Sequence, residues 1–421
     1  MIGLTDGQRI TVIIGLDDTD HPETGCTTHS FDSLLRTISD SNMFEVTERR
    51  LVRLWPFASR RTRGNGALSA IVEIDADSAT ELEDLCSKWF DELALSISNH
   101  PDEGIPASPC LAISYKHPPE SWYWDSVRGQ VDLEKRKSEA SEFGLKIFSL
   151  DEGWGIIGAS AAISWIPDQD SSWELVAWRD DEKVGTNRDV SQDSVIEMAE
   201  KHPETFLNRD PTKGKGMIAP RTPCPVLYGI RGSTCEAVSE AHKWMQERVD
   251  VESSSSWAPH RTNQLSDDHL TGICSGTVLM PPSEGRGAHT HLSVISGGST
   301  RQLVVFKEGG HVNRLVRQLN TGDRINWLGL ESPDGSIHLE RVSVQSAVPR
   351  ISSRPSCCGR TMRSAGRGQP LRCLVCGENS EKFWVSKPWS PSGVSSISGW
   401  YEPTPSQRRH LAKPLNQGIP S

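Results

Sequence analysis

The chain has 421 residues, a formal net charge of −10, and 35% hydrophobic residues. This length allows several domains with separate cores, and the negative overall charge argues against a polyanion bound over the whole surface. Because no window approaches the roughly 18 consecutive apolar residues of a membrane span, and the N-terminus lacks a signal peptide, we expect a cytoplasmic protein with no membrane partner.

An acidic turn follows the first expected strand, residues 8–16, and carries Asp17, Asp18 and Asp20. A helix is expected over residues 27–38, so its first amides face any anion bound beside the turn. Carboxylates this close repel one another unless a cation such as Mg²⁺ holds them, usually together with phosphate oxygens. The turn indicates ATP chemistry, but an acidic turn with Asx hydrogen bonds and a threonine cap explains it equally well.

A cluster of six arginines lies between Arg49 and Arg63 and ends in a glycine-containing loop, residues 61–66. Arginine side chains pair with phosphates, and glycine lets backbone amides approach them. Phosphate contact is therefore one interpretation of this loop, and a solvated basic loop is the other.

Two βαβ patterns lie far apart in the chain. The first has strand 67–74, helix 78–93 and strand 110–115, and the second has strand 225–232, helix 236–248 and an apolar-polar stretch near Val249. Two such halves favour a ferredoxin-like domain split by an insertion at about 116–217, which contains the strand Trp173–Trp178. A contiguous domain order without interleaving is the alternative.

A β-rich region follows the run Ser253–Ser256, which we interpret as a loop or linker. Its expected elements are strands 272–279, 291–295, 302–306, 324–330 and 337–344, with a helix at 312–319 and a turn at Asp334-Gly335. Five strands with a helix after the third describe an OB-fold, which commonly binds single-stranded nucleic acid. A generic β domain used for protein contacts is the alternative.

Four cysteines crowd into the basic C-terminal region, where residues 350–421 hold 11 Lys or Arg against 3 Asp or Glu. Cys373 and Cys376 have the C-x₂-C spacing of a zinc knuckle, and Cys358 and the adjacent Cys357 precede them by a hairpin length. Cys357 fits less well because Pro355 stands where the first knuckle needs a cysteine. We expect one structural Zn²⁺ rather than four free thiols.

Several of these segments together resemble the archaeal tRNA-isoleucine agmatidine synthetases, the TiaS family of 2-agmatinylcytidine synthetases. The matching segments are Gly15–Asp20 with Gly25–Thr28, Thr62–Ala67, Pro225–Gly232, Arg261–Gln264, Gly399–Pro403 and Arg408–Leu415. The matches run in family order along nearly the whole chain, so their combination is specific.

The resemblance implies an ATP-dependent ligase. Cleavage of ATP to AMP activates O2 of the wobble cytidine in the CAU anticodon of an isoleucine tRNA, and agmatine then displaces the phosphoryl group, so that AUA is decoded. By motif position, Asp17, Asp18 and Asp20 hold Mg²⁺ and the triphosphate, and Thr27 is the autophosphorylated threonine. The remaining ATP-binding positions implied are Thr19, Gly25, Cys26, Thr28, Arg61, Arg63, Gly64 and Asn65.

The fold class expected from the pattern and the resemblance is multidomain α/β. We expect a kinase-like α/β ATP-binding domain (1–62 and 116–217), a ferredoxin-like α+β domain (63–115 and 218–262), an OB-fold β-barrel (263–348), and a zinc ribbon with a basic tail (349–421). The barrel and tail are expected to grip the tRNA, and no obligate protein partner is indicated. Glu174 is one hypothesis for the carboxylate that receives the guanidinium of agmatine. Two rival functions are a non-catalytic RNA-binding protein and a small-molecule kinase.

Overall fold

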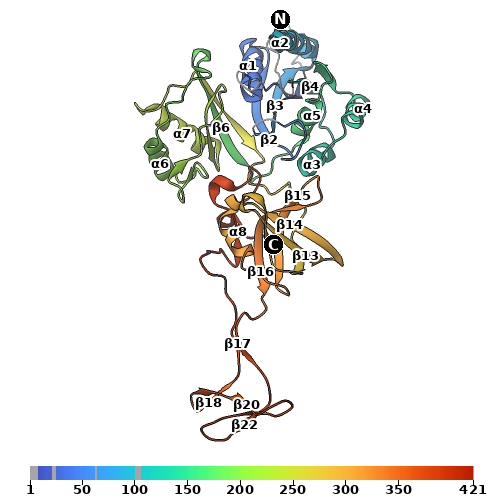
Figure 1. The fold of residues 1–421 in the computed structure, drawn as a ribbon. Helices are drawn as coiled ribbons and strands as arrows, with labels where there is room; N and C mark the ends of the chain where they lie inside the picture. Colours follow the sequence, from blue (N-terminus) through green and yellow to red (C-terminus); the bar gives the residue numbers. More distant parts are fainter. Residues whose placement is uncertain (1–7, 21–24, 62–63, 100–105, 421) are drawn as a thin grey trace, which may run out of the picture. The chain divides into compact units, whose positions relative to one another are not determined.

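The computed structural model describes residues 8–20, 25–61, 64–99 and 106–420. The chain forms two compact units, Met1–Thr271 with Arg408–Pro414, and Gly272–Gln407 with Leu415–Ser421 (Figure 1). Among the described helices, none has the length and apolar character needed to cross a membrane. The expected multidomain architecture of mixed α/β type is confirmed.

An eight-stranded sheet forms the centre of the first unit. Its order is β5 (Lys146–Ser149), β4 (Cys110–Ser114), β1 (Arg9–Asp17), β3 (Gly66–Asp75), β2 (Glu45–Arg53), β10 (Ser256–Thr262), β6 (Ser172–Trp178) and β9 (Val226–Gly232). Neighbouring strands are antiparallel except β2 and β10, which are parallel. A short hairpin, β7 (Arg209–Asp210) with β8 (Lys215–Gly216), lies outside this sheet.

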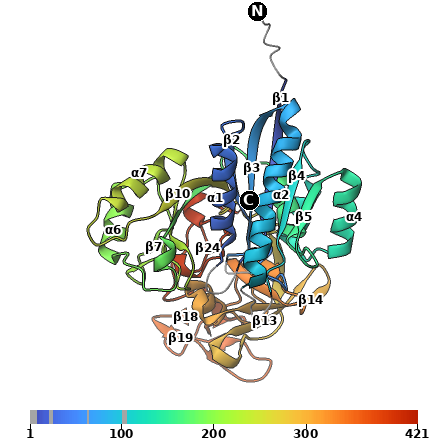
Figure 2. The same ribbon diagram turned by 90° about the horizontal axis from the view of Figure 1, so that it is seen from above.

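Helices cover both faces of the sheet. They are α1 (Thr27–Asp40), α2 (Ala79–Asn99), α3 (Ser121–Arg128), α4 (Leu133–Phe143), α5 (Ile156–Ser164), α6 (Gln192–Lys201) and α7 (Cys235–Gln246). Because side chains alternate along a strand, Val12, Ile14 and Leu16 of β1 pack with α1 and α2, whereas Ile13 packs with α4 and α5. Figure 2 shows α6 and α7 on the side of the sheet that holds β10, and α4 on the side that holds the edge strand β5.

The central strand β10 was missed by the sequence analysis, which placed the end of the second βαβ pattern near Val249. Val249 is exposed, and the strand begins at Ser256, the last residue of the serine run. Ser255 is already held by a hydrogen bond from its amide to the Trp178 carbonyl (2.9 Å). The strand contains Pro259, and a proline argues against a central strand in a sequence, so the pairing with β6 and β2 is what reveals it.

The strand pairing does not follow the expected interleaving of residues 1–62 and 63–115. Strand β1 lies between β3 and β4 and pairs with both, so these two ranges share one sheet. In the same way β6 lies between β9 and β10. Strand β1 therefore completes the first βαβ pattern and β6 completes the second, each as an antiparallel strand that is near its pattern in the sequence. The alternative of contiguous domains, without interleaving, describes this pairing better.

The second unit contains a closed barrel. Its strands are β11 (Cys274–Val278), β12 (Ser283–Glu284), β13 (Thr290–Ser296), β14 (Ser299–Val305), β15 (Arg324–Glu331) and β16 (Ile337–Ser346), with α8 (His311–Val316) after β14. The sheet runs β11-β15-β16-β14-β13-β12 and closes through the pairing of β11 with β13. Val294, Leu303 and Trp327 belong to its buried core. All five expected strands and the expected helix are present.

The region after the barrel consists of short strands. These are β17 (Ser352–Ser353), β18 (Ser356–Cys357), β19 (Arg360–Thr361), β20 (Arg363–Ser364), β21 (Leu371–Arg372), β22 (Asn379–Ser380) and β23 (Val385–Ser386). We call residues 352–386 the cysteine lobe. β24 (Trp400–Tyr401) returns to pair with β16 of the barrel.

Candidate active site

The acidic turn begins at Asp17, the last residue of β1. Helix α5 approaches it closely, because a Cβ atom at Gly158 would lie 1.8 Å from Oδ2 of Asp17 and one at Gly155 would lie 2.5 Å from its carbonyl oxygen. Burial, reinforced by the neighbouring charge of Asp18, holds the pKa of Asp17 well above its usual range. Gly155 and Gly158 thus let a helix pack directly against a carboxylate.

Asp18 faces Arg60. The Asp18 backbone has φ of 60°, in the left-handed region that only a few per cent of non-glycine residues adopt. Arg60 Nη2 lies 3.6 Å from Asp18 Oδ2, and the same guanidinium donates to the Pro106 carbonyl at 2.6 Å and stands over the Trp154 ring. Burial raises the pKa of Asp18 to about 6, although the charge of Arg60 opposes this rise.

Asp20 turns toward the start of α1 instead. Its Oδ1 atom accepts hydrogen bonds from the Thr27 amide (2.6 Å) and from the Thr27 hydroxyl (3.1 Å). The Thr19 amide donates to the same hydroxyl at 3.4 Å. The predicted threonine and one predicted aspartate are therefore in direct contact, with Thr27 buried.

The other residues predicted around the helix start lie nearby. Cys26 is the buried N-cap residue of α1, and its Sγ is 3.1 Å from Thr28 Oγ1. Trp178 of β6 donates its indole N–H to the same Thr28 oxygen at 3.1 Å. Gly25 lies directly before this cap. Burial raises the pKa of the Cys26 thiol to about 11, which leaves it a neutral thiol at ordinary pH.

The basic loop is only partly as predicted. Arg61 is exposed and reaches the Ala58 carbonyl (3.5 Å), and Arg63 lies outside the described residues. Asn65 has φ of 41° and donates to the Trp55 carbonyl at 2.6 Å. Among the described arginines of the loop, Arg60 reaches the acidic turn; the sequence analysis counted it in the cluster but did not select it. Spacing alone does not tell which arginine of a loop points inward.

A pocket of about 680 Å³, open to solvent, brings the turn and the loop together. Its polar lining includes Asp17, Asp18, Arg60 and Asn65, and its apolar lining includes Leu54, Trp55, Val131, Trp154 and Ile157. A concave site that combines apolar side chains with a few convergent polar and charged groups is a usual form of a small-molecule site.

Glu174 is not free to receive a ligand's guanidinium, so that hypothesis is wrong. Its carboxylate is buried and already pairs with two arginines of the chain, Arg53 Nη2 at 2.8 Å and Arg231 Nη2 at 3.5 Å. Burial alone would raise the pKa of Glu174, but these two charges outweigh it and lower the pKa to about 2. The partners come from β2 and β9, and no local sequence signal brings them together.

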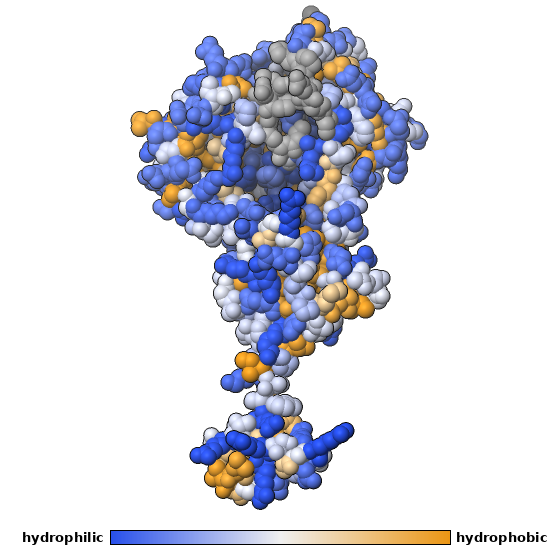
Figure 3. Space-filling model, viewed as in Figure 1, coloured by the Kyte–Doolittle hydropathy of each residue, from blue (hydrophilic) through white to orange (hydrophobic). Residues whose placement is uncertain are grey.

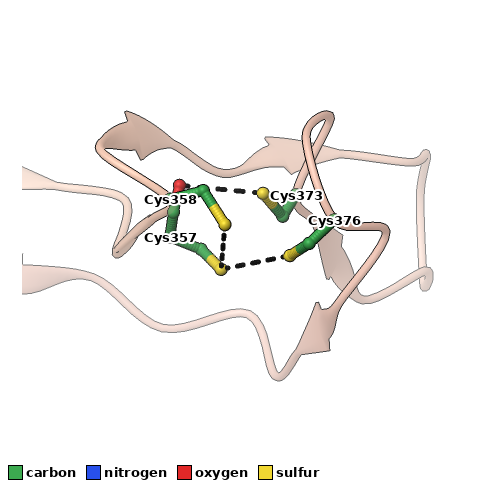
Figure 4. A group of neighbouring side chains, drawn as sticks. All are labelled: Cys357, Cys358, Cys373 and Cys376. Atoms are coloured by element: carbon green, nitrogen blue, oxygen red, sulfur yellow. Dashed lines mark hydrogen bonds between the residues drawn. The ribbon is translucent and has the colours of Figure 1, made fainter.

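The four cysteines of the lobe form a second, separate candidate site, a metal centre (Figure 4). The Sγ atoms of Cys357, Cys358, Cys373 and Cys376 all lie within 4.8 Å of one another. Backbone amides of Cys376 and Val375 lower the pKa of the Cys373 thiol to about 7. Four converging thiols are the donor set of a structural zinc site, and the adjacent pair supplies two of them. Within the described ranges, Asp17, Asp18 and Asp20 do not form a comparable preassembled group.

The structure thus combines an acidic strand end beside a helix start with a closed barrel and a cysteine lobe. Residues 13–152 match the family model for the TiaS TCKD domain, and residues 153–269 match that for the TiaS FLD domain. The tRNA(Ile2) 2-agmatinylcytidine synthetase TiaS of Archaeoglobus fulgidus is 30% identical over 425 residues, covering 96% of this chain and 97% of that relative. The chain belongs to the TiaS family.

Solved structures agree with this assignment. The crystal structure of the TiaS–tRNA(Ile2)–ATP complex has a TM-score of 0.80 and 27% identity, covering 97% of this chain and 98% of that one. The crystal structure of the TiaS–tRNA(Ile2)–AMPCPP–agmatine complex has a TM-score of 0.77 and 26% identity with the same coverage. The resemblance stated from the motifs is thereby confirmed.

Proposed function

We propose that this chain uses ATP to attach agmatine to C2 of the wobble cytidine in the CAU anticodon of an isoleucine tRNA, forming agmatidine. The observation that carries the proposal is the match over 97% of the chain to TiaS structures that contain tRNA(Ile2), ATP and agmatine. Since the proposed substrates are a tRNA, ATP and agmatine, we also propose that the chain acts in the cytoplasm.

The acidic turn is the proposed magnesium and triphosphate site. Asp17 and Asp18 are partly buried carboxylates with raised pKa values, and Arg60 contacts Asp18. Mg²⁺ needs only one or two carboxylates when phosphate oxygens supply its other ligands, so the three aspartates need not converge before ATP binds. When bound, the ion neutralises phosphate charge.

Thr27 is the proposed phosphoryl acceptor. Asp20 accepts the hydrogen bond of its hydroxyl, so Asp20 is placed to take the proton as the threonine oxygen bonds to phosphorus and the bond from phosphorus to the leaving phosphate oxygen breaks. The turn around this pair is shaped by Thr19, Gly25, Cys26 and Thr28. The first amides of α1 face the same side and favour the negative charge of a phosphate.

The basic loop is the proposed second wall of the nucleotide site. Asn65 lines the pocket, and Gly64 allows a close approach of the backbone. Arg60 joins the predicted Arg61 and Arg63 as a candidate phosphate contact, because its guanidinium is the one beside Asp18. Apolar side chains such as Leu54, Val131 and Ile157 line the rest of the pocket.

The domain names are part of the proposal. A division near residue 152 into a kinase-like ATP-binding region and a ferredoxin-like region is supported by the strand pairing, in place of the interleaved boundaries. An OB-fold over 263–348 is supported by the closed barrel, in which β14 and β16 are parallel. A zinc ribbon within 349–421 is supported by the four-cysteine cluster. The barrel and the lobe are the proposed tRNA-binding parts.

The test is incorporation of labelled agmatine into an unmodified isoleucine tRNA transcript with a CAU anticodon, in the presence of ATP and Mg²⁺. We expect incorporation and AMP release with this transcript and neither with a methionine tRNA that has the same anticodon. Tight tRNA binding without incorporation would instead support a non-catalytic RNA-binding protein, and phosphorylation of a metabolite without tRNA would support a kinase.

A variant separates catalysis from RNA binding. Asp18→Asn should lower incorporation by at least about a hundredfold, because it removes a proposed magnesium ligand, and should leave tRNA affinity unchanged. Asp91→Asn, on the exposed side of α2, is the matched control and should retain activity. Parallel loss of activity and tRNA affinity in folded Asp18→Asn protein would contradict the division of roles.

A further inference from the structure

A buried charge network lies beneath the loop that lines the pocket. Glu174 is its centre and pairs with Arg53 and Arg231. Gln264 donates its side-chain amide to Glu174, and its Oε1 atom accepts from Arg231 Nε (3.1 Å) and lies 3.3 Å from His410 Nδ1. The members come from three strands, the segment after β10 and the C-terminal segment. Breaking a buried pair of this kind leaves an uncompensated charge, so the network has little freedom to rearrange.

One end of this network holds the pocket wall. Arg53 uses Nη2 for Glu174 and Nη1 for the Gly64 carbonyl (3.1 Å). A Cβ atom at Gly64 would lie 2.2 Å from Nη1, so a larger residue there would displace the Arg53 guanidinium from this position. The Leu54 amide donates to the Asn65 carbonyl (2.9 Å), which ties both edges of the loop together. Arg53 therefore connects the buried carboxylate to residues that line the pocket.

The other end of the network is the C-terminal segment 408–414. The amides of Leu265 and Asp267 donate to the carbonyls of His410 (3.0 Å) and Leu411 (2.9 Å). The Leu411 side chain is buried and packs in a cluster with Leu54 and Tyr123. Burial, followed by the charges of Arg53 and Arg231, lowers the pKa of His410 to about 3, so its ring is neutral and adds no third positive charge.

A side-chain clamp joins the two ends. Asn263 Oδ1 accepts from the Arg53 amide (2.7 Å), and Asn263 Nδ2 donates to the Arg53 carbonyl (2.9 Å) and to Tyr123 Oη (2.9 Å). Asn263 immediately precedes Gln264, which contacts His410. The end of β2, the segment after β10 and residues 408–414 thus form one hydrogen-bonded assembly.

We propose that Arg53 and Glu174 are positioning residues that hold Gly64 and, through it, the adjacent pocket-lining residue Asn65, and that residues 408–414 complete this assembly. The inference deepens the proposed function and rests on it. It assigns this segment to the catalytic unit, whereas the sequence analysis counted it with the RNA-binding tail. In this proposal none of the three groups contacts a substrate, since each acts by holding the loop backbone in place.

The test uses Arg53→Lys in the full-length protein. Lysine keeps the positive charge beside Glu174, but a single ammonium lacks the guanidinium fork that reaches both Glu174 and Gly64. We expect hydrogen exchange of the Leu54 and Trp55 amides to become at least about tenfold faster, and agmatine incorporation to fall at least about tenfold, with tRNA affinity within about twofold of the parent. Arg9→Lys, in the exposed pair with Glu45, is the matched control and should change neither.

A second variant tests the C-terminal segment and covers the case in which Arg53→Lys does not fold. Leu411→Ala should also speed exchange of the Leu54 and Trp55 amides and lower incorporation, without weakening tRNA binding. Unchanged exchange and activity in folded Arg53→Lys, or a Leu411→Ala protein that loses only tRNA affinity, would overturn the inference. Amide exchange measures the stability of the loop and needs no catalytic activity. An inactive parent protein would therefore count against the proposed function but not against the positioning roles.

Discussion

The first unit and the cysteine lobe maintain their structures by different means. The first unit buries a continuous apolar cluster in which Val12, Phe31 and Leu35 are fully inaccessible. The buried cluster of the lobe contains Met362, Leu371 and Cys373. Figure 3 shows apolar groups on the surface of the lobe, where Leu374, Val375 and Trp384 are more than half exposed.

This difference in core size indicates that the first unit can fold through burial of apolar side chains, whereas we expect the cysteine lobe to need a cross-link. Segments with so small a core usually depend on a metal or disulfides. The sulfur atoms of the lobe converge, and all ten cysteines of the chain are free thiols. Three changes, taken from the largest expected effect to the smallest, test this contrast.

Removal of the proposed zinc should have the largest effect, because structural zinc contributes about 10–16 kcal/mol of binding free energy that is coupled to folding. We expect about one zinc per chain, measured by elemental analysis, and loss of the ordered NMR signals of the lobe after chelation or in Cys376→Ser. The signals of the first unit should persist. Cys274→Ser, at an exposed cysteine outside the cluster, is the control and should keep the metal. A lobe that stays ordered without metal would contradict the expectation that the lobe, unlike the first unit, needs a cross-link.

A core truncation in the first unit should have the next largest effect. Phe31→Ala removes a fully buried ring of α1 and should lower the free energy of unfolding by about 3–5 kcal/mol. Zinc content should not change. The measurement is denaturant unfolding, with Leu95→Ala on α2, where the side chain is 64% exposed, as the control within about 0.5 kcal/mol of the parent. Equal effects of the two changes would show that this cluster is not the main source of stability.

Acid should weaken the first unit by a smaller amount through His260 of β10. Burial, aided by the charge of Arg49, lowers the pKa of His260 from 6.5 to about 4. Between these values the unfolded chain binds a proton that the folded protein excludes, so stability is present above pH 6.5 and is lost as pH falls toward 4. The loss from this group approaches about 3 kcal/mol near pH 4.

The measurement for His260 is the free energy of unfolding between pH 7 and pH 4 in the parent and in His260→Gln. The glutamine variant should show a shallower decline in acid, since it has no group that titrates there. The same substitution at the exposed His291 of the barrel is the control. Parallel pH curves for the parent and His260→Gln would assign the acid sensitivity to other groups.

Many local features could be predicted from the sequence because their signals are contiguous. Strand β1 ends at the predicted turn, α1 begins at Thr27 as expected, and the five barrel strands with their helix lie within a few residues of the predicted ranges. The four thiols also converge as predicted, since the knuckle spacing and the intervening hairpin require no distant partner. Short-range periodicity and spacing were sufficient for each of these features.

The sequence by itself therefore determined the local elements, the cluster of four cysteines and, through its motifs, the family. Only the tertiary structure decided that Arg60 faces Asp18, that Glu174 is already neutralised by Arg53 and Arg231, and that β10 joins the middle of the sheet. It also placed His410 beside Gln264. The physical reason is that these contacts join residues far apart in the chain, and charges and serines carry no pattern that specifies their partners until the apolar core brings the strands together.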